Sequence, residues 1–319
     1  MNEAIRITEV APRDGLQNEP GVIATADKAE LVRRLMSIGA AEVEVSSFVS
    51  PKWIPQLGDA AKVFAAIADE PRDGVMLSAL VPNERGMQSL LKVNKDAGGD
   101  RPLIGKVSVF TAASETFSHR NTNATIAETI ERFRPVIAKA RAHNLATRGY
   151  VSCAVACPFE GPIAPSAVHD VCAQLLAIGI DEIDLGDTIG HGTPDTIAAA
   201  IEAAIDALDG RSETATGDPS LTLHLHDTFG RAASCIEAAL DCGVRSFDSS
   251  AAGLGGCPFA STPTQRAPGN ISTETLIATL EAAGFAPGID RSKLASASAF
   301  AERIVQAARM QAAADEAAS

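Results

Sequence analysis

The segment EIDLGDTIGHGTPDTIAAAIEAAIDAL, residues 182–208, contains one complete strand-and-helix unit. The short run EIDLGD predicts a buried strand, and Thr193-Pro194 fits the start of a helix. Apolar side chains then recur at the spacing of one helix face, at Ile197, Ile201, Ile205 and Leu208. The segment therefore predicts a strand, a loop and a helix that buries one face.

The same unit recurs along the chain. Seven further short apolar and β-branched runs predict strands, at residues 5–10, 43–48, 75–81, 106–111, 148–153, 221–226 and 246–250. Eight units without a linker predict an α/β fold, a closed (β/α)8 TIM barrel over residues 1–290. Residues 291–319 predict a C-terminal helical extension and tail. The alternative is an open doubly wound sheet, but its glycine fingerprint for a dinucleotide is missing.

The composition excludes several classes of partner. The chain has 319 residues and a formal net charge of −13, which disfavours nucleic-acid binding that depends on Lys and Arg. No unbroken apolar run approaches the roughly 18 residues of a membrane span, and the N-terminal residues lack a signal-peptide pattern. We therefore predict a soluble cytoplasmic protein whose six cysteines are thiols.

The strand LTLHLH, residues 221–226, places two histidines on one face. Successive strand side chains point to opposite faces, so His224 and His226 face the barrel interior and the leucines face the helices. Strand ends meet at one mouth of a barrel, which favours metal binding over a pair of hydrogen-bonded core histidines. The aspartates that follow two of the strands, Asp187 and Asp227, either orient these imidazoles or cap helices.

Two further side chains at the mouth offer oxygen ligands to the same ion. Asp14 follows the first strand, and Asn270 lies in the loop after the last strand. Together with His224 and His226 they supply two oxygens and two nitrogens. Such a set suits Mg²⁺ or Mn²⁺, with zinc as the alternative.

Arg13 stands directly beside Asp14 in the turn after the first strand. A fixed positive charge next to a metal-bound carboxylate would stabilise an oxyanion that develops on a substrate. The alternative is a purely structural Arg–Asp pair. Glu44 lies on the interior face of the second strand, where an unpaired carboxylate is costly, so Arg13 or the ion is its expected partner.

The segment AGLGGCPFASTPTQRAPGN, residues 252–270, is rich in glycine. Glycines allow turns that other residues resist, and they would present Cys257 on a mobile lid loop near the mouth. Most cysteines in soluble proteins are buried and inert, whereas this one is a candidate acid or nucleophile. Because the same loop carries Asn270, metal binding and lid closure would be coupled.

Seven motifs occur in order along roughly residues 5–290. They are APRDGLQNEP, SSFVSPKWIPQLGD, FTAASETFSHRN, RGYVSCAVACPFEG, LGDTIGHGTP, LHLHDTFG and DSSAAGLGGCPFA. Together they closely resemble the motifs of the hydroxymethylglutaryl-CoA lyases, a family of the DRE-TIM metallolyase superfamily. The Gly-Gly-Cys loop is a feature of these lyases that the related synthases lack.

The resemblance implies a divalent cation, Mg²⁺ or Mn²⁺, held by Asp14, His224, His226 and Asn270. It also implies an acyl-CoA thioester substrate, 3-hydroxy-3-methylglutaryl-CoA or a close branched analogue, which is cleaved to acetyl-CoA and a 3-oxo acid. Asp14, with His224 or Glu44 behind it, would remove the hydroxyl proton of the substrate. Arg13 would stabilise the enolate oxygen, and Cys257 would protonate the enolate carbon.

Two alternatives to a lyase remain. A Claisen-type acyl-CoA/2-oxo acid synthase of the same superfamily would share the metal and Arg13 but would not need Cys257. A catalytically silent barrel that acts as a binding subunit would have no reason to retain the whole set of site residues. Barrels of this kind commonly associate, so a homo-oligomer is expected without a defined number of subunits.

Overall fold

The strands close into a parallel barrel. The computed structural model describes residues 4–72, 74–208, 221–256 and 269–317. The barrel strands are β1 (Arg6–Glu9), β2 (Glu42–Ser47), β3 (Met76–Leu80), β4 (Lys106–Ala112), β5 (Ala146–Ser152), β8 (Glu182–Asp187), β9 (Leu221–Leu225) and β10 (Ser246–Ser249). Arg6 of β1 pairs with Ser246 of β10, which closes the ring in the order β1-β10-β9-β8-β5-β4-β3-β2. The predicted barrel is confirmed, and the open doubly wound sheet is excluded.

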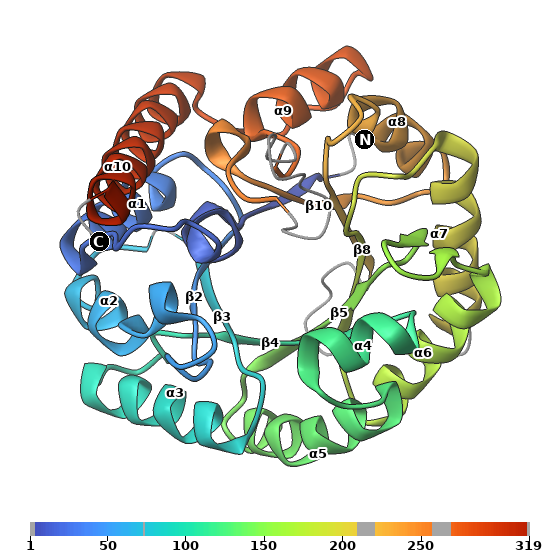
Figure 1. Cartoon of the computed structure of the whole chain (residues 1–319), viewed down its shortest axis with the longest axis horizontal. Helices are drawn as coiled ribbons and strands as arrows, with labels where there is room; N and C mark the ends of the chain where they lie inside the picture. The colour runs from blue at the N-terminus through green and yellow to red at the C-terminus, as the bar shows by residue number, and fades with distance from the viewer. Residues whose placement is uncertain (1–3, 73, 209–220, 257–268, 318–319) are drawn as a thin grey trace.

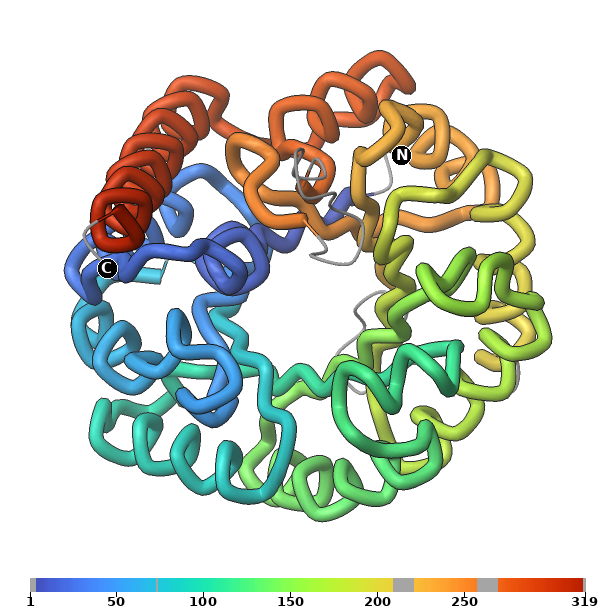
Figure 2. The backbone as a smooth tube through the Cα atoms, in the orientation of Figure 1, coloured from blue at the N-terminus to red at the C-terminus, as the bar shows by residue number. Residues whose placement is uncertain are grey.

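A ring of helices surrounds the barrel (Figures 1 and 2). The ring helices are α1 (Thr25–Met36), α2 (Ala60–Ala66), α3 (Glu84–Ala97), α5 (Ile126–Ala142), α6 (Pro165–Ala177), α7 (Pro194–Leu208), α8 (Ala232–Asp241) and α9 (Thr273–Ala282). Their apolar faces and the outward faces of the strands form one continuous core. None of the helices described is both long and apolar enough to cross a bilayer.

Local signals set the limits of several helices. Gly39 and Gly179 follow α1 and α6 with φ of 95° and 97°, a conformation that residues with a Cβ atom resist. Thr125 and Glu128 form a capping box at the start of α5. The Thr125 hydroxyl accepts a hydrogen bond from Glu128 N at 3.1 Å, and the Glu128 carboxylate accepts one from Thr125 N at 2.8 Å.

The C-terminal helix α10 (Arg291–Ala317) packs beside α1 in the helical ring (Figure 1). Its buried face belongs to the same apolar core, through Leu294, Ala297, Phe300, Ala301, Ile304, Val305 and Ala308. Asp290 N donates a hydrogen bond to Ile38 O at 2.8 Å, which ties the start of α10 to the end of α1. The predicted helical extension is confirmed, while a domain boundary at residue 290 stays a prediction.

Several short elements that the sequence did not predict lie in the loops between the strands and the ring helices. They are the π-helix η1 (Ala11–Gly15), the 3₁₀ helices η2 (Pro55–Leu57) and η3 (Ala251–Gly253), helix α4 (Glu115–Thr122), and the antiparallel pair β6 (Ala156–Cys157) and β7 (Gly161–Pro162). Active sites of such barrels lie at the carboxyl ends of the strands, so these elements shape the candidate site.

Charged side chains fill part of the barrel interior. Lys106 Nζ lies 2.6 Å from Glu42 Oε2 and 2.7 Å from Glu182 Oε2. Arg148, which is fully buried, lies 2.7 Å from Glu182 Oε1 and 3.1 Å from Asp248 Oδ1. Buried charges require such partners, because an unpaired charge away from water is costly. This network therefore connects strands β2, β4, β5, β8 and β10 across the barrel interior.

Candidate functional site

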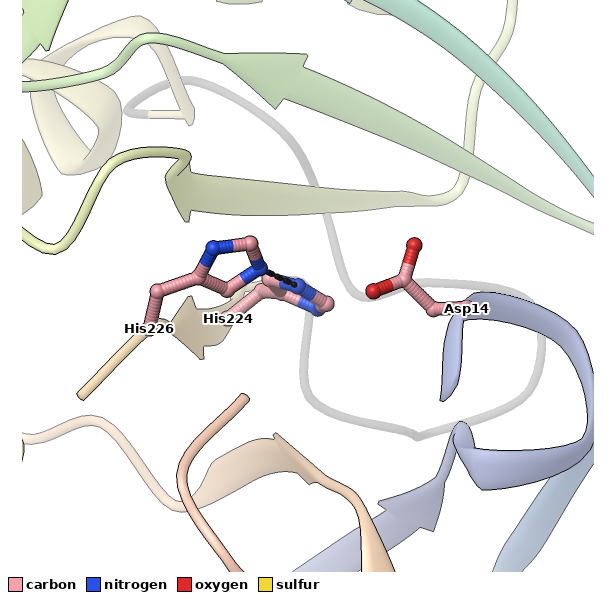
Figure 3. A group of neighbouring side chains, drawn as sticks. All are labelled: Asp14, His224 and His226. Atoms are coloured by element: carbon pink, nitrogen blue, oxygen red, sulfur yellow. Dashed lines mark hydrogen bonds between the residues drawn. The ribbon is translucent and has the colours of Figure 1, made fainter. Parts of the chain in front are cut away.

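Asp14, His224 and His226 converge in the barrel (Figure 3). One potential ligand atom from each residue lies within 4.8 Å of the other two, and the Nε2 atoms of the histidines are 3.4 Å apart. Figure 3 shows the Asp14 carboxylate directed toward the two imidazoles. The predicted alternation of β9 is confirmed, because its leucines belong to the apolar core while both histidines line a cavity.

Asn270 adds an oxygen that has no partner among the described residues. Its backbone bridges to His226, and its Nδ2 donates hydrogen bonds to Asp14 Oδ2 and Leu254 O, both at 2.9 Å. Within the described part of the chain, Asn270 Oδ1 is buried and accepts no hydrogen bond. A buried polar atom of this kind calls for a partner, and an amide oxygen is a ligand that hard cations prefer. The donor set therefore fits Mg²⁺ or Mn²⁺.

The protonation states of the cluster also suit a cation. Burial raises the pKa of Asp14, but the charge of Arg13 and those of the two histidines outweigh burial and lower the pKa to about 2. Burial and the neighbouring His224 lower the pKa of His226 to about 4. At neutral pH Asp14 is therefore an anion and His226 a neutral imidazole, which are the forms that bind metal ions.

Arg13 is held by two carboxylates. It lies with Asp14 in the π-helix η1, directly after β1. Arg13 Nη1 donates to Asp14 Oδ1 and Arg13 Nε donates to Glu44 Oε2, each at 2.5 Å. Its guanidinium carbon also lies 5.2 Å from the centre of the Tyr150 ring. The expected pairing of Glu44 with Arg13 is confirmed, and these contacts fix the orientation of a permanent positive charge in the cavity wall.

The carboxylate that orients His224 is Asp248, which the sequence analysis did not single out. Asp248 Oδ2 lies 3.0 Å from His224 Nδ1, which favours a proton on Nδ1 and leaves Nε2 free to bind a cation. Asp187 instead accepts hydrogen bonds from two backbone amides of the following loop. Asp227 accepts one from the first residue of α8. Asp227 therefore caps the start of α8, whereas Asp187 holds the loop before α7, and neither aspartate forms a hydrogen bond to His224 or His226.

Two other side chains missed in the sequence connect these pairs. The Tyr150 hydroxyl donates to Glu44 Oε2 at 3.1 Å and lies 3.2 Å from Asp248 Oδ2. Arg148 Nη1 donates to Asp248 Oδ1 at 3.1 Å. They thereby join the carboxylate that holds the arginine to the carboxylate that orients the histidine. Arg148 and Tyr150 lie two positions apart in the strand RGYVSC, so both side chains point to the same face of the strand. This pattern, which includes the only tyrosine of the chain, was the signal from which they could have been found.

The cluster lines a cavity of about 690 Å³. The apolar side chains around it are Val49, Trp53, Ile54, Leu80, Pro82, Phe110, Phe117 and Phe133. Polar side chains in the same lining include Asn83, Arg120, Asn121 and Arg132. A cavity of this size and mixed character accommodates an extended ligand with an apolar part and a few polar groups.

Cys257 lies outside the described residues, so its predicted role stays a prediction. The described chain reaches Gly256, which lines the cavity. Gly256 O accepts a hydrogen bond from Asn18 Nδ2 at 3.2 Å, which connects this segment to the one that follows η1.

Known proteins identify the family. A family model described as HMGL-like matches residues 4–301. The hydroxymethylglutaryl-CoA lyase, mitochondrial, of Arabidopsis thaliana is 43% identical over 296 residues, which are 93% of this chain and 58% of that protein. The 3-hydroxy-3-isohexenylglutaryl-CoA/hydroxy-methylglutaryl-CoA lyase of Pseudomonas aeruginosa is 42% identical over 93% of this chain and 91% of its own length. The crystal structure of the HMG-CoA lyase from Brucella melitensis superimposes with a TM-score of 0.85 at 45% identity, over 95% of this chain and 99% of that one. Barrel, residue cluster and sequence agree, and the chain belongs to the HMGL-like family.

Proposed function

We propose that the protein is a divalent-metal-dependent carbon–carbon lyase. It cleaves 3-hydroxy-3-methylglutaryl-CoA, or a close branched 3-hydroxyglutaryl-CoA, to acetyl-CoA and a 3-oxo acid. One observation carries the proposal: Asp14 and two imidazoles form one cluster beside a cavity that Arg13 also lines. Asn270 is hydrogen-bonded to Asp14, and its Oδ1 is buried without a partner among the described residues. The names of the relatives support the substrate class.

The cation would be held by Asp14, His224, His226 and Asn270. Mg²⁺ or Mn²⁺ suits this set, because it offers nitrogen and oxygen ligands and no thiolate. A bound divalent cation acts as a Lewis acid that lowers the pKa of a substrate hydroxyl. Asp14, which is an anion beside the proposed cation, would accept the hydroxyl proton. His224 is the alternative acceptor.

Arg13 and Cys257 serve the second half of the reaction. Once the hydroxyl proton is lost, the oxygen becomes a ketone, the adjacent carbon–carbon bond breaks, and its electrons move to the thioester as an enolate. Arg13 donates hydrogen bonds to the enolate oxygen, and Glu44 holds Arg13 in place for this step. The Cys257 thiol gives its proton to the enolate carbon, which completes acetyl-CoA.

The length of the alkyl branch on the tertiary carbon of the substrate remains to be measured. The relative from Pseudomonas aeruginosa is named for an isohexenyl as well as a methyl substrate. The apolar side chains of Leu80, Phe110 and Phe117 in the cavity lining favour an alkyl branch of either length. Comparison of kcat/KM for thioesters with methyl and longer alkyl branches measures this preference.

The direct test is an assay of purified protein with added Mg²⁺ or Mn²⁺. Acetyl-CoA and acetoacetate are expected from 3-hydroxy-3-methylglutaryl-CoA, with activity lost on chelation and restored by the cation. Release of free CoA from acetyl-CoA and a 2-oxo acid would instead support the synthase. No cleavage of any 3-hydroxyglutaryl thioester would support a silent binding subunit.

His226→Ala tests the cation site. We expect the affinity for Mn²⁺ to fall by at least about tenfold. Removal of a side chain that only hydrogen-bonds to a metal ligand already lowers metal affinity by about 10- to 100-fold, and His226 is itself a proposed ligand. Turnover at limiting Mn²⁺ should fall in parallel, and titration followed by electron paramagnetic resonance measures the affinity. His191→Ala is the matched control, since His191 is exposed and outside the cluster. Unchanged affinity in His226→Ala would remove this residue from the ligand set.

Location and assembly stay predictions. Both mitochondrial and cytoplasmic names occur among the relatives, so their names do not decide the cytoplasmic location. Light scattering coupled to size-exclusion chromatography would measure whether the chain forms the expected homo-oligomer.

A further inference from the structure

Glu9, the last residue of β1, is a fully buried carboxylate on the side of the strand that faces the helices. Its neighbour Thr8 has the opposite orientation and contacts Arg148 in the barrel interior. Glu9 Oε1 accepts hydrogen bonds from Ala11 N and Ala251 N, both at 2.9 Å. Glu9 Oε2 accepts from the Thr273 hydroxyl at 2.8 Å and from Ala251 N at 3.1 Å.

Each of these three donor residues is the first residue of a segment that contains a site residue or lies close to one in the chain. Ala11 is the first residue of η1, which contains Arg13 and Asp14. Ala251 is the first residue of η3, which leads toward Cys257. Thr273 is the first residue of α9 and lies three positions after Asn270. A single carboxylate on β1 therefore contacts two segments that lie 242 and 264 positions further along the chain.

The same three segments are packed without free space at the cluster. A Cβ atom on Gly15 would lie 3.0 Å from Leu254 Cβ, so η1 and the residue after η3 are already in contact. A Cβ atom on Gly255 would lie 2.5 Å from Asn270 Nδ2 and 3.3 Å from Asp14 Oδ2. Relative movement of these segments would therefore displace Asp14 from Asn270.

We propose that Glu9 is a positioning residue for the metal centre, which sets the separation of Asp14 from Asn270 by holding η1, η3 and the start of α9 together. The inference rests on the proposed function, because it assumes that these two residues bind the cation. Glu9 itself lies on the other side of β1 from the cluster and touches neither ligand. Its effect is transmitted through the backbone.

The ionised form of Glu9 is costly to the fold, which argues for a role beyond stability. Burial raises the pKa of Glu9 from its ordinary 4.5 to about 7, and the charge of Glu274 adds to this, against the lowering effect of the backbone hydrogen bonds. A raised pKa means that the protonated form favours folding below pH 4.5, and that this contribution is lost as the pH rises through about 7. At pH 8, glutamine at this position should therefore fold at least as stably as glutamate. Costly groups of this kind are retained mainly at functional sites.

The test uses three variants of the full chain. Glu9→Gln keeps the shape but removes the charge, and Thr273→Val removes one donor without changing the shape. Glu19→Gln is the control, because Glu19 is also a buried acid of the N-terminal segment, but it pairs with Arg309 on α10. Mn²⁺ affinity is measured at pH 8 without substrate, together with the midpoint of thermal unfolding.

Glu9→Gln is expected to weaken Mn²⁺ binding by about tenfold, the lower end of the effect of removing support from a metal ligand, with an unfolding midpoint equal to or above that of the wild type. Thr273→Val should lower the affinity by about two- to threefold, and Glu19→Gln should leave it unchanged.

Wild-type affinity in both Glu9→Gln and Thr273→Val would overturn the inference. So would a parallel loss of affinity and unfolding midpoint in Glu9→Gln. If Glu9→Gln does not fold, Thr273→Val decides. A wild-type protein that binds no Mn²⁺ would instead refute the cation site of the proposed function.

Discussion

Replacement of Arg13 by lysine is expected to lower kcat by about 10²- to 10³-fold, the usual effect of losing one donor to an oxyanion. Lysine keeps the positive charge, but a single ammonium group cannot reproduce the planar fork that reaches Glu44 and Asp14 at once. The enolate exists only as the bond breaks, so kcat and kcat/KM should fall together with little change in KM. Steady-state kinetics at saturating Mn²⁺ measures this loss.

The control for this variant is Arg134→Lys, at an exposed site on α5 where Arg134 pairs with Glu131. It should keep kcat, because exposed ion pairs contribute little. The affinity of Arg13→Lys for Mn²⁺ should stay close to that of the wild type, since Arg13 is not a proposed ligand. Wild-type kcat in Arg13→Lys would contradict the catalytic role and leave a structural Arg–Asp pair as the explanation.

Replacement of Cys257 by serine is expected to lower turnover by about 10²- to 10⁴-fold, the range of a missing general acid. A serine hydroxyl has nearly the same size as a thiol but releases a proton far less readily. The affinity for Mn²⁺ should stay nearly unchanged, because the four proposed ligands are retained. Single-turnover measurement of acetyl-CoA formation and a Mn²⁺ titration separate the two effects.

Cys242→Ser is the matched control, since Cys242 is a partly exposed thiol at the end of α8. It should retain full turnover. Loss of Mn²⁺ affinity together with turnover in Cys257→Ser would indicate that the cysteine supports its loop and does not act on the substrate.

The barrel was predictable because its signals are local. Alternation along residues 221–226 depends on neighbours two positions apart, and the capping box of Thr125 and Glu128 spans three positions. The meeting of Asp14 with the histidines also followed from the sequence, although they lie more than 200 positions apart. A parallel barrel brings the carboxyl ends of all its strands to one mouth, so assignment of the strands was sufficient.

The partners of the buried charges were not predictable in this way. Asp187, Asp227 and Asp248 each lie within or directly beside a barrel strand, yet among these three only Asp248 contacts His224. Likewise, no local pattern distinguishes Glu9 from other acids at strand ends. Its partner Thr273 lies 264 positions further along the chain.

The sequence by itself therefore determined the eight barrel strands, the ring of helices around them, the barrel and the types of side chain at its mouth. Only the tertiary structure decided which carboxylate orients an imidazole, which holds Arg13, and which joins the segments of Asp14 and Asn270. The physical reason is that hydrogen bonds and charge interactions depend steeply on distance, direction and burial. Strand register and loop packing set these quantities, and the periodicity of residue types in the sequence does not specify them.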